Sequence, residues 1–181
     1  MLAVAVAVIG CRPAPVLNPD KERATESAST VQREVEMASA PGGVVTARDG
    51  SQVDLATLWA EAPAVVVFYR GHWCPHCQRQ LGELEKRRVE FGASKVIAIS
   101  SDQPADLGAM KDKLGLGFEL YSDAQLAVIM KWGVEDAGKC IAKPATFIVT
   151  PSGAIAFRKV GERPEDRPSV DEIPQALANA K

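Results

Sequence analysis

The chain has 181 residues, of which 46% are apolar and 24% are charged, and its formal net charge is −2. This length suits one domain with an extension better than two domains. Charges of both signs are mixed along the chain, so we expect no basic surface for nucleic acid and no nucleic-acid partner. The composition is that of a globular protein with a conventional buried core.

The first residues differ from the rest. Leu2–Ile9 is an unbroken run of small apolar residues, followed by Gly10 and Cys11. The run is too short to span a membrane as a helix, which needs about 20 apolar residues, but it suits the core of a signal peptide. Residues 8–11 resemble the lipobox of bacterial lipoproteins, in which the chain is cut before the cysteine.

We therefore expect a signal or lipoprotein leader at residues 1–10 and a lipid on Cys11. The lipid would anchor the protein to a membrane of the bacterial cell envelope, facing outside the cytoplasm, on the periplasmic side or at the outer membrane. The alternative is an ordinary cleaved signal or a core strand, with Cys11 incidental.

Residues 11–43 are rich in Pro, Ser, Thr, Ala and Glu and have little apolar periodicity, so they predict a flexible linker. From Val44 to Lys181 the pattern is that of a single domain in which strands and helices alternate. Strands are predicted at 44–46, 52–54, 64–69, 95–100, 118–121, 145–149 and 154–159, and helices at 55–60, 75–91, 104–114, 124–132 and 170–180. This alternation predicts an α/β fold with a mixed central β-sheet and helices on both faces.

The pattern Cys74-Pro75-His76-Cys77 stands where the buried strand at 64–69 gives way to a helix. Pro75 suits the first helical position, which places Cys74 at the N-cap, facing unpaired N–H groups and the positive end of the helix dipole. Both effects favour the thiolate, which is the nucleophile. Cys77 comes round one turn later, close enough to form a disulfide with Cys74, and His76 can lower the pKa of Cys74 further.

A Cys-x-x-Cys pair is also half of a zinc site, which normally needs two further ligands. The only histidines, His72 and His76, lie in the same short segment, so a four-ligand site is sterically poor. We expect neither a metal site nor a cofactor, and keep a copper- or zinc-binding module as the less favoured alternative. A purely structural disulfide would not explain the place of the pair at a strand-to-helix turn.

The segment from Phe68 to Cys77 resembles the active-site segment of the peroxiredoxin-like proteins of the thioredoxin superfamily, of the alkyl hydroperoxide reductase/thiol-specific antioxidant type. Lys143–Val149 resembles a second part of that family. The resemblance covers residues 44–181 and implies a thioredoxin-like fold. It also implies that Pro144, which matches a cis proline of the superfamily, packs beside the reactive disulfide and shapes the groove for the partner.

The same resemblance implies two possible activities, disulfide exchange and peroxide reduction. Peroxidatic members carry a threonine where this chain has Cys74, the reactive cysteine where it has Cys77, and a peroxide-binding arginine where it has Pro144. We therefore expect a thiol–disulfide oxidoreductase in which Cys74 attacks and Cys77 resolves. The alternative is a thiol peroxidase that reduces hydroperoxides with Cys77 or Cys74, for which Arg70 could partly replace the missing arginine.

The expected partners are protein or small-molecule thiols and disulfides, with hydroperoxides in the alternative. Trp73 is expected to shield the active-site loop. Cys140 is either a third redox thiol or, as we favour, a small buried hydrophobe.

Overall fold

The computed structural model describes residues 39–180, and its main feature is one mixed sheet of seven strands. The strands lie in the order β2-β1-β5-β4-β3-β8-β9. Their bounds are β1 Val44–Thr46, β2 Gln52–Asp54, β3 Ala64–Phe68, β4 Lys95–Ser100, β5 Glu119–Ser122, β8 Ala145–Val149 and β9 Ile155–Val160. A separate short hairpin is formed by β6 (Glu135–Asp136) and β7 (Ile141–Ala142).

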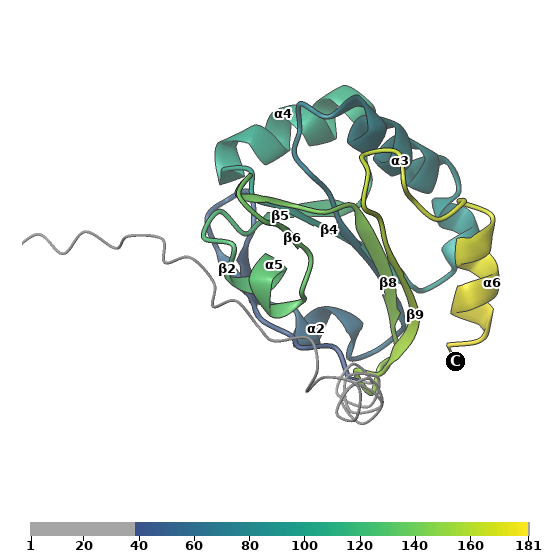
Figure 1. Cartoon of the computed structure of the whole chain (residues 1–181). Coiled ribbons are helices and arrows are strands. Elements are labelled where there is room, and N and C mark those ends of the chain that lie inside the picture. Colours follow the sequence, from purple (N-terminus) through teal and green to yellow (C-terminus); the bar gives the residue numbers. More distant parts are fainter. Residues whose placement is uncertain (1–38, 181) are drawn as a thin grey trace, which may run out of the picture. The chain divides into compact units, whose positions relative to one another are not determined.

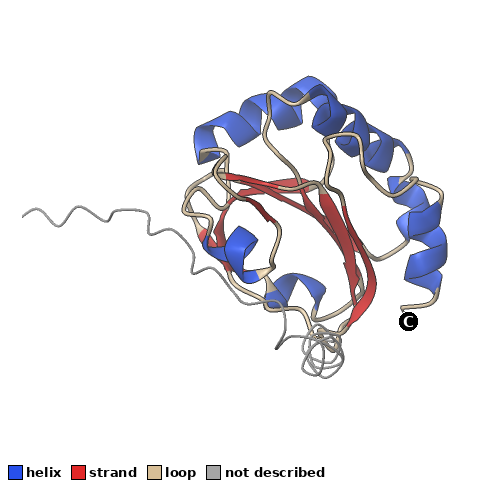
Figure 2. Ribbon diagram, in the orientation of Figure 1, coloured by secondary structure: helices blue, strands red, loops and turns tan. Residues whose placement is uncertain are grey.

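Helices cover both faces of this sheet, as Figures 1 and 2 show. On one face lie α3, α4 and α6, and on the other lie α2 and α5. Their bounds are α2 Ala56–Trp59, α3 Pro75–Lys86, α4 Pro104–Leu114, α5 Ala127–Lys131 and α6 Glu172–Ala178, with a 3₁₀ helix, η2, at Arg88–Phe91. The α/β, thioredoxin-like fold expected from the sequence is confirmed.

The central strand β3 is buried on both sides because its residues alternate between two apolar cores. Val65 and Val67 pack into the core beneath α3, α4 and α6. Ala64, Val66 and Phe68 pack into the core beneath α2 and α5. β3 runs parallel to β4 and antiparallel to β8, so it is held between two strands along its whole length.

The strands at 95–100 and 145–149 and the helix at 104–114 have the predicted bounds. The helix predicted at 75–91 is shorter, since α3 ends at Lys86 and the chain tightens into η2 up to Phe91. The last helix begins at Glu172, so that Pro174 falls in its first turn, where a missing N–H costs nothing.

The predicted leader at 1–10, Cys11 and the linker as far as residue 38 lie outside the described residues, so these predictions remain predictions. Within residues 39–180, none of the helices has the length and apolar character needed to cross a membrane.

The core beneath α5 predicts the cost of truncating an aromatic side chain. Phe147 is fully buried, with its ring 5.0 Å from that of Trp132 and 5.9 Å from that of Phe68. We expect Phe147→Ala to lower the free energy of unfolding by about 3–5 kcal/mol, because it leaves a cavity in a packed core. Val89→Ala, at a side chain that is 92% exposed, is the control and should change it by less than about 0.5 kcal/mol in the same urea titration. Equal effects of the two changes would contradict the described core.

Candidate redox site

The cysteine pair lies at the first turn of α3. Cys74 is the N-cap, with an extended backbone (φ −83°, ψ 116°), and Pro75 follows at the start of the helix. The carbonyl of Cys74 accepts hydrogen bonds from the N–H groups of Cys77 and Gln78, both at 3.0 Å, which close the first turn. Both thiols are free and buried, with exposed fractions of 1% for Cys74 and 0% for Cys77. The structure is therefore that of the reduced pair, in the placement that the sequence predicts.

The surroundings shift the pKa values of the two thiols in opposite directions. Burial raises the pKa of Cys74, but hydrogen bonds from the thiol and backbone N–H of Cys77 lower it, as do the charges of Arg167 and Arg70, and the net shift is downward. Burial raises the pKa of Cys77, and its hydrogen bond to Cys74 raises it further, while Arg167 offsets part of this effect. Cys74 is thus the thiol that ionises first, and Cys77 is the one that keeps its proton.

Arg167, in the loop between β9 and α6, binds the other thiol. Its Nη2 donates a hydrogen bond to Sγ of Cys77 at 3.3 Å, and its Nη1 donates to Oε1 of Gln80. Its Nε donates to the carbonyl of Pro164 at 3.0 Å. Gln80 in turn donates to Oγ1 of Thr146, on β8, at 3.3 Å. The guanidinium is therefore fixed beside the redox pair by two residues of α3 and by its own loop, and Gln80 is held in turn by β8.

Asp102, in the loop after β4, anchors the segment that leads into α3. Its Oδ2 accepts hydrogen bonds from the N–H of His72 and the hydroxyl of Ser100, both at 2.8 Å. Its Oδ1 lies 2.9 Å from Nδ1 of His72. Gly71 has no room for a side chain, because a Cβ there would lie 2.5 Å from Nε1 of Trp73 and 3.1 Å from Oδ1 of Asp102. The buried carboxylate of Asp102, in the loop that follows β4, thus holds the loop before Cys74 in place.

The other residues predicted around the pair lie on the surface of this loop. Trp73 is 51% exposed, and the guanidinium of Arg70 lies over its ring, 5.2 Å from the centroid. Nδ1 of His76 lies 3.0 Å from Nη2 of Arg79. A guanidinium is only a donor, so Nδ1 is the acceptor in this pair. His76 is not among the main groups that shift the pKa of Cys74, and its part in tuning that thiol remains a prediction.

Pro144 is buried at the end of β8 nearest the redox loop, because Ala145 pairs with Phe68, the last residue of β3. The expectation of a cis bond is wrong: residues 39–180 contain no cis peptide bond. The trans form is the more stable isomer even before proline. It is accommodated here by hydrogen bonds on both sides, from the N–H of Lys143 to the carbonyl of Val134 (2.6 Å) and from the N–H of Gly161 to the carbonyl of Pro144 (2.8 Å).

Cys140 is exposed, so its interpretation as a small buried hydrophobe is wrong. It ends the turn between β6 and β7, with a left-handed backbone (φ 52°), and a turn of this kind offers no core for its side chain. Among residues 39–180, no group of three or more His, Cys, Asp or Glu side chains is arranged to hold a metal ion.

Sequence reasoning assigned no role to Arg167, Gln80 or Asp102. Arg167 lies in the loop between β9 and α6, outside the predicted helices and strands. Asp102 had a signal, since it follows the predicted strand at 95–100. Polar residues after the carboxyl ends of parallel strands gather at one edge of the sheet.

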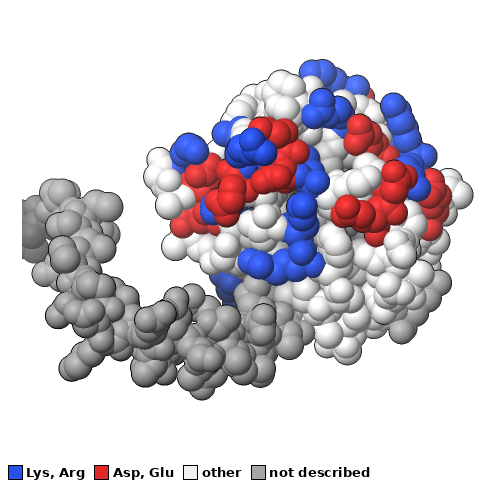
Figure 3. Space-filling view, turned by 45° about the vertical axis from the view of Figure 1, so that its right-hand side comes forward, with Lys and Arg blue, Asp and Glu red and all other residues white. Residues whose placement is uncertain are grey.

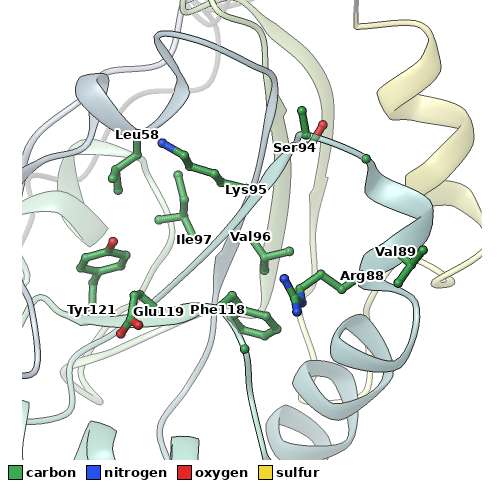
Figure 4. A pocket seen from close by; sticks show the side chains of 13 residues that line it. Leu58, Arg88, Val89, Ser94, Lys95, Val96, Ile97, Phe118, Glu119 and Tyr121 are labelled. Atoms are coloured by element: carbon green, nitrogen blue, oxygen red, sulfur yellow. The ribbon is translucent and has the colours of Figure 1, made fainter.

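A surface cavity of about 420 Å³ lies away from this site (Figure 4). Its lining includes Lys95 and Glu119, the first residues of β4 and β5, whereas Cys74 follows the carboxyl end of the parallel strand β3. The length of a strand, about 17 Å, therefore separates the cavity from the redox pair. On the face seen in Figure 3, basic and acidic side chains are interspersed.

A central strand that leads into a helix beginning at a buried thiol pair, with one thiol activated and the other protonated, defines a thiol-based redox enzyme of thioredoxin-like fold. The chain belongs to the AhpC/TSA family, whose sequence profile matches residues 36–158.

Its relatives include proteins with two kinds of name. A Mycobacterium tuberculosis protein that carries the name peroxiredoxin is 29% identical over 124 residues, which are 64% of this chain and 78% of that protein. The thiol-disulfide oxidoreductase ResA of Halalkalibacterium halodurans is 26% identical over 110 residues, 59% of this chain and 58% of that one.

Solved structures show the shared fold. A peroxiredoxin-like protein from Aquifex aeolicus superposes with a TM-score of 0.70 at 19% identity, covering 79% of this chain and 85% of that one. The peroxidoxin BcpB of Mycobacterium tuberculosis gives a TM-score of 0.67 at 20% identity, covering 78% and 93%.

The place of Arg167 predicts how its removal changes the titration of the pair. Arg167→Gln removes a charge that lowers the pKa of both thiols. We expect the pKa of Cys74 to rise, because a positive charge that favours its thiolate is lost. Thiolate absorbance in the ultraviolet measures it, in a Cys11→Ser, Cys140→Ser background so that only the pair titrates.

Arg163→Gln is the matched control for this titration. Arg163 lies in the same loop, its side chain is 71% exposed, and its nearest charged partner is Glu165. The same shift in both variants, or none in Arg167→Gln, would show that Arg167 does not tune the pair.

Proposed function

We propose that the protein is a thiol–disulfide oxidoreductase that cycles a disulfide between Cys74 and Cys77 through mixed disulfides with a partner. The observation that supports this most is the opposite shift of the two pKa values. Disulfide exchange needs one thiol that is ionised and attacks, and a second that stays protonated until the mixed disulfide has formed. A lone peroxide-reducing thiolate would need no such neighbour one helical turn away.

The reaction has two steps. The Cys74 thiolate attacks a disulfide of the partner, one partner sulfur leaves as a thiolate, and a mixed disulfide joins Cys74 to the other. Cys77 then loses its proton and attacks Sγ of Cys74, which releases the second partner thiolate and closes the Cys74–Cys77 disulfide. The partner gains two electrons and the pair loses two. The reverse sequence oxidises a dithiol, and the reduction potential of the pair sets the net direction.

The partner is proposed to be a protein or a small molecule that presents an exposed disulfide or thiol. The name of the relative ResA, a thiol-disulfide oxidoreductase, supports this class of substrate. Trp73 and Pro75, both exposed at the mouth of the site, supply apolar surface beside Cys74.

A second candidate function, a thiol peroxidase, is favoured by one observation. The guanidinium of Arg167 lies 3.3 Å from Sγ of Cys77 and supplies the positive charge whose usual position is taken here by Pro144. The raised pKa of Cys77 opposes this candidate, because the protonated thiol is a poor nucleophile for peroxide. The name peroxiredoxin, carried by other relatives, is the reason to test it.

Single cysteine variants separate the two functions. With glutathione disulfide, we expect Cys77→Ser to accumulate a stable glutathione adduct on Cys74, because no thiol is left to resolve it. Cys74→Ser should accumulate none on the tryptic peptide of residues 71–79. Mass spectrometry of that peptide detects the adduct without interference from the exposed Cys140.

Cys140→Ser is the control and should form the internal disulfide as readily as the unaltered protein, since Cys140 is an exposed thiol of the β6–β7 turn. The opposite pattern would establish the peroxidase: hydrogen peroxide reduction that persists in Cys74→Ser and disappears in Cys77→Ser.

A further inference from the structure

Tyr69 has a buried hydroxyl that packing does not explain. Within residues 39–180, its hydroxyl oxygen is the one fully buried side-chain nitrogen or oxygen atom without a hydrogen-bond partner. The side chain is 0% exposed and lies in the same core cluster as Cys74 and Cys77. A buried hydroxyl that has lost its water and gained no partner destabilises the fold. Phenylalanine would fill the same space without this cost, so a role in the chemistry is the better explanation.

The neighbours of this hydroxyl lead to the surface. β3 and β4 are parallel with Phe68 opposite Ile99, so that Tyr69 comes opposite Ser100. Ser100 donates a hydrogen bond to Asp102, whose carboxylate also binds His72. The side chain of Asp102 is 6% exposed and that of His72 is 42% exposed. A line of polar groups therefore runs from the interior beside the redox pair to solvent.

Groups on two sides of the Tyr69 side chain affect the pKa of its hydroxyl. Burial raises its pKa most, so Tyr69 is neutral, and it is perturbed further by Ser100 and Asp102 on one side and by Cys77 on the other. Its pKa is therefore sensitive to both a thiol and a carboxylate, although no partner lies in hydrogen-bond geometry to the hydroxyl.

The second step of the exchange needs an acceptor for the proton of Cys77. Cys77 is 0% exposed, so bulk water does not reach its thiol. Cys74 and Arg167 are the groups that most affect the pKa of Cys77, and Cys77 in turn affects the pKa of Tyr69. Arg167 has no lone pair to accept a proton, and Cys74 is bound to the partner at this step. Of the three groups, Tyr69 is therefore the one that can accept the proton, and Asp102 lies next along the line of polar groups.

We propose that Tyr69 and Asp102 form the route by which the buried Cys77 loses its proton as it attacks the mixed disulfide on Cys74. The inference rests on the proposed function and names the residues that its second step needs. Tyr69 takes the proton of Cys77 while its own proton passes to the carboxylate of Asp102. The Cys77 thiolate forms the bond to Sγ of Cys74, and the partner leaves as a thiolate. Asp102 then releases the proton to solvent at the half-exposed edge of His72.

An aromatic disulfide, dithiobis(nitrobenzoate), separates the two steps in stopped flow, because each step releases one coloured thiolate. All variants, and the protein with which they are compared, carry Cys11→Ser and Cys140→Ser, so that only the redox pair reacts. We expect Tyr69→Phe to leave the first phase unchanged and to slow the second about 100-fold, the lower end of what positioned proton transfer contributes. The pH at which the second phase is half-maximal should move upward, since hydroxide must replace the route. Thermal unfolding should show a variant at least as stable as the unaltered protein, because only an unpartnered hydroxyl is removed.

The chain offers a matched control, since Tyr121 is its only other tyrosine and is buried in the opposite core. Tyr121→Phe should change neither phase. Asp102→Asn should slow the second phase as Tyr69→Phe does, and the double variant should be no slower than the slower single variant, because both residues serve one route.

Two results would overturn the proposal and leave the proposed function standing: a second phase in Tyr69→Phe that matches Tyr121→Phe at every pH, or equal slowing of both phases. Release of a single thiolate by the unaltered protein, with no disulfide between Cys74 and Cys77, would overturn the proposed function itself and the route with it.

Discussion

The placement of Cys74 and Cys77 on one helical turn is the constraint on which the chemistry of this site depends. The first turn of α3 is closed by the hydrogen bond from the N–H of Cys77 to the carbonyl of Cys74, and the mutual influence of the two thiols lowers the pKa of Cys74 while it raises that of Cys77. Two buried thiols of the same kind thereby become a nucleophile and a proton-bearing partner. The turn itself follows from Pro75, which has the backbone conformation of a first helical residue. It also follows from β3, an interior strand between β4 and β8, which leads into this turn.

Two loops from distant parts of the chain complete the site. The loop after β4 contributes Asp102, whose carboxylate binds His72 in the segment before Cys74. The loop before α6 contributes Arg167, which is fixed by Gln80 and Pro164 and places its charge against Cys77. The carboxylate of Asp102 thus lies beside the segment before Cys74, and the guanidinium of Arg167 lies beside Cys77. This division lets the site stabilise a thiolate and still provide a carboxylate as a proton acceptor.

Much of the fold was predictable from the sequence, because β3 is a continuous apolar run, β4 and β8 are largely apolar, and α3 and α4 each begin with a proline. The N-cap position of Cys74 was predictable for the same local reason. Arg167 was not, since it reaches the site through tertiary packing that leaves no periodic pattern in the chain, whereas the place of Asp102 after the strand at 95–100 was a signal that could have been used. The exposure of Cys140 was predicted wrongly, because it depends on the turn between β6 and β7, and the bond before Pro144 is trans, not cis. The leader and the lipid on Cys11 remain predictions of the sequence.

The central claim is that Cys74, and not Cys77, is the attacking thiolate. Brief alkylation of the reduced protein at neutral pH with less than one equivalent of iodoacetamide tests it directly. Both thiols lie on one tryptic peptide, residues 71–79, so fragmentation of that peptide in the mass spectrometer shows which sulfur is modified. The account predicts that the label on this peptide is on Cys74. Labelling that falls first on Cys77 would contradict it and would assign the reactive thiolate to the position of a peroxidatic cysteine.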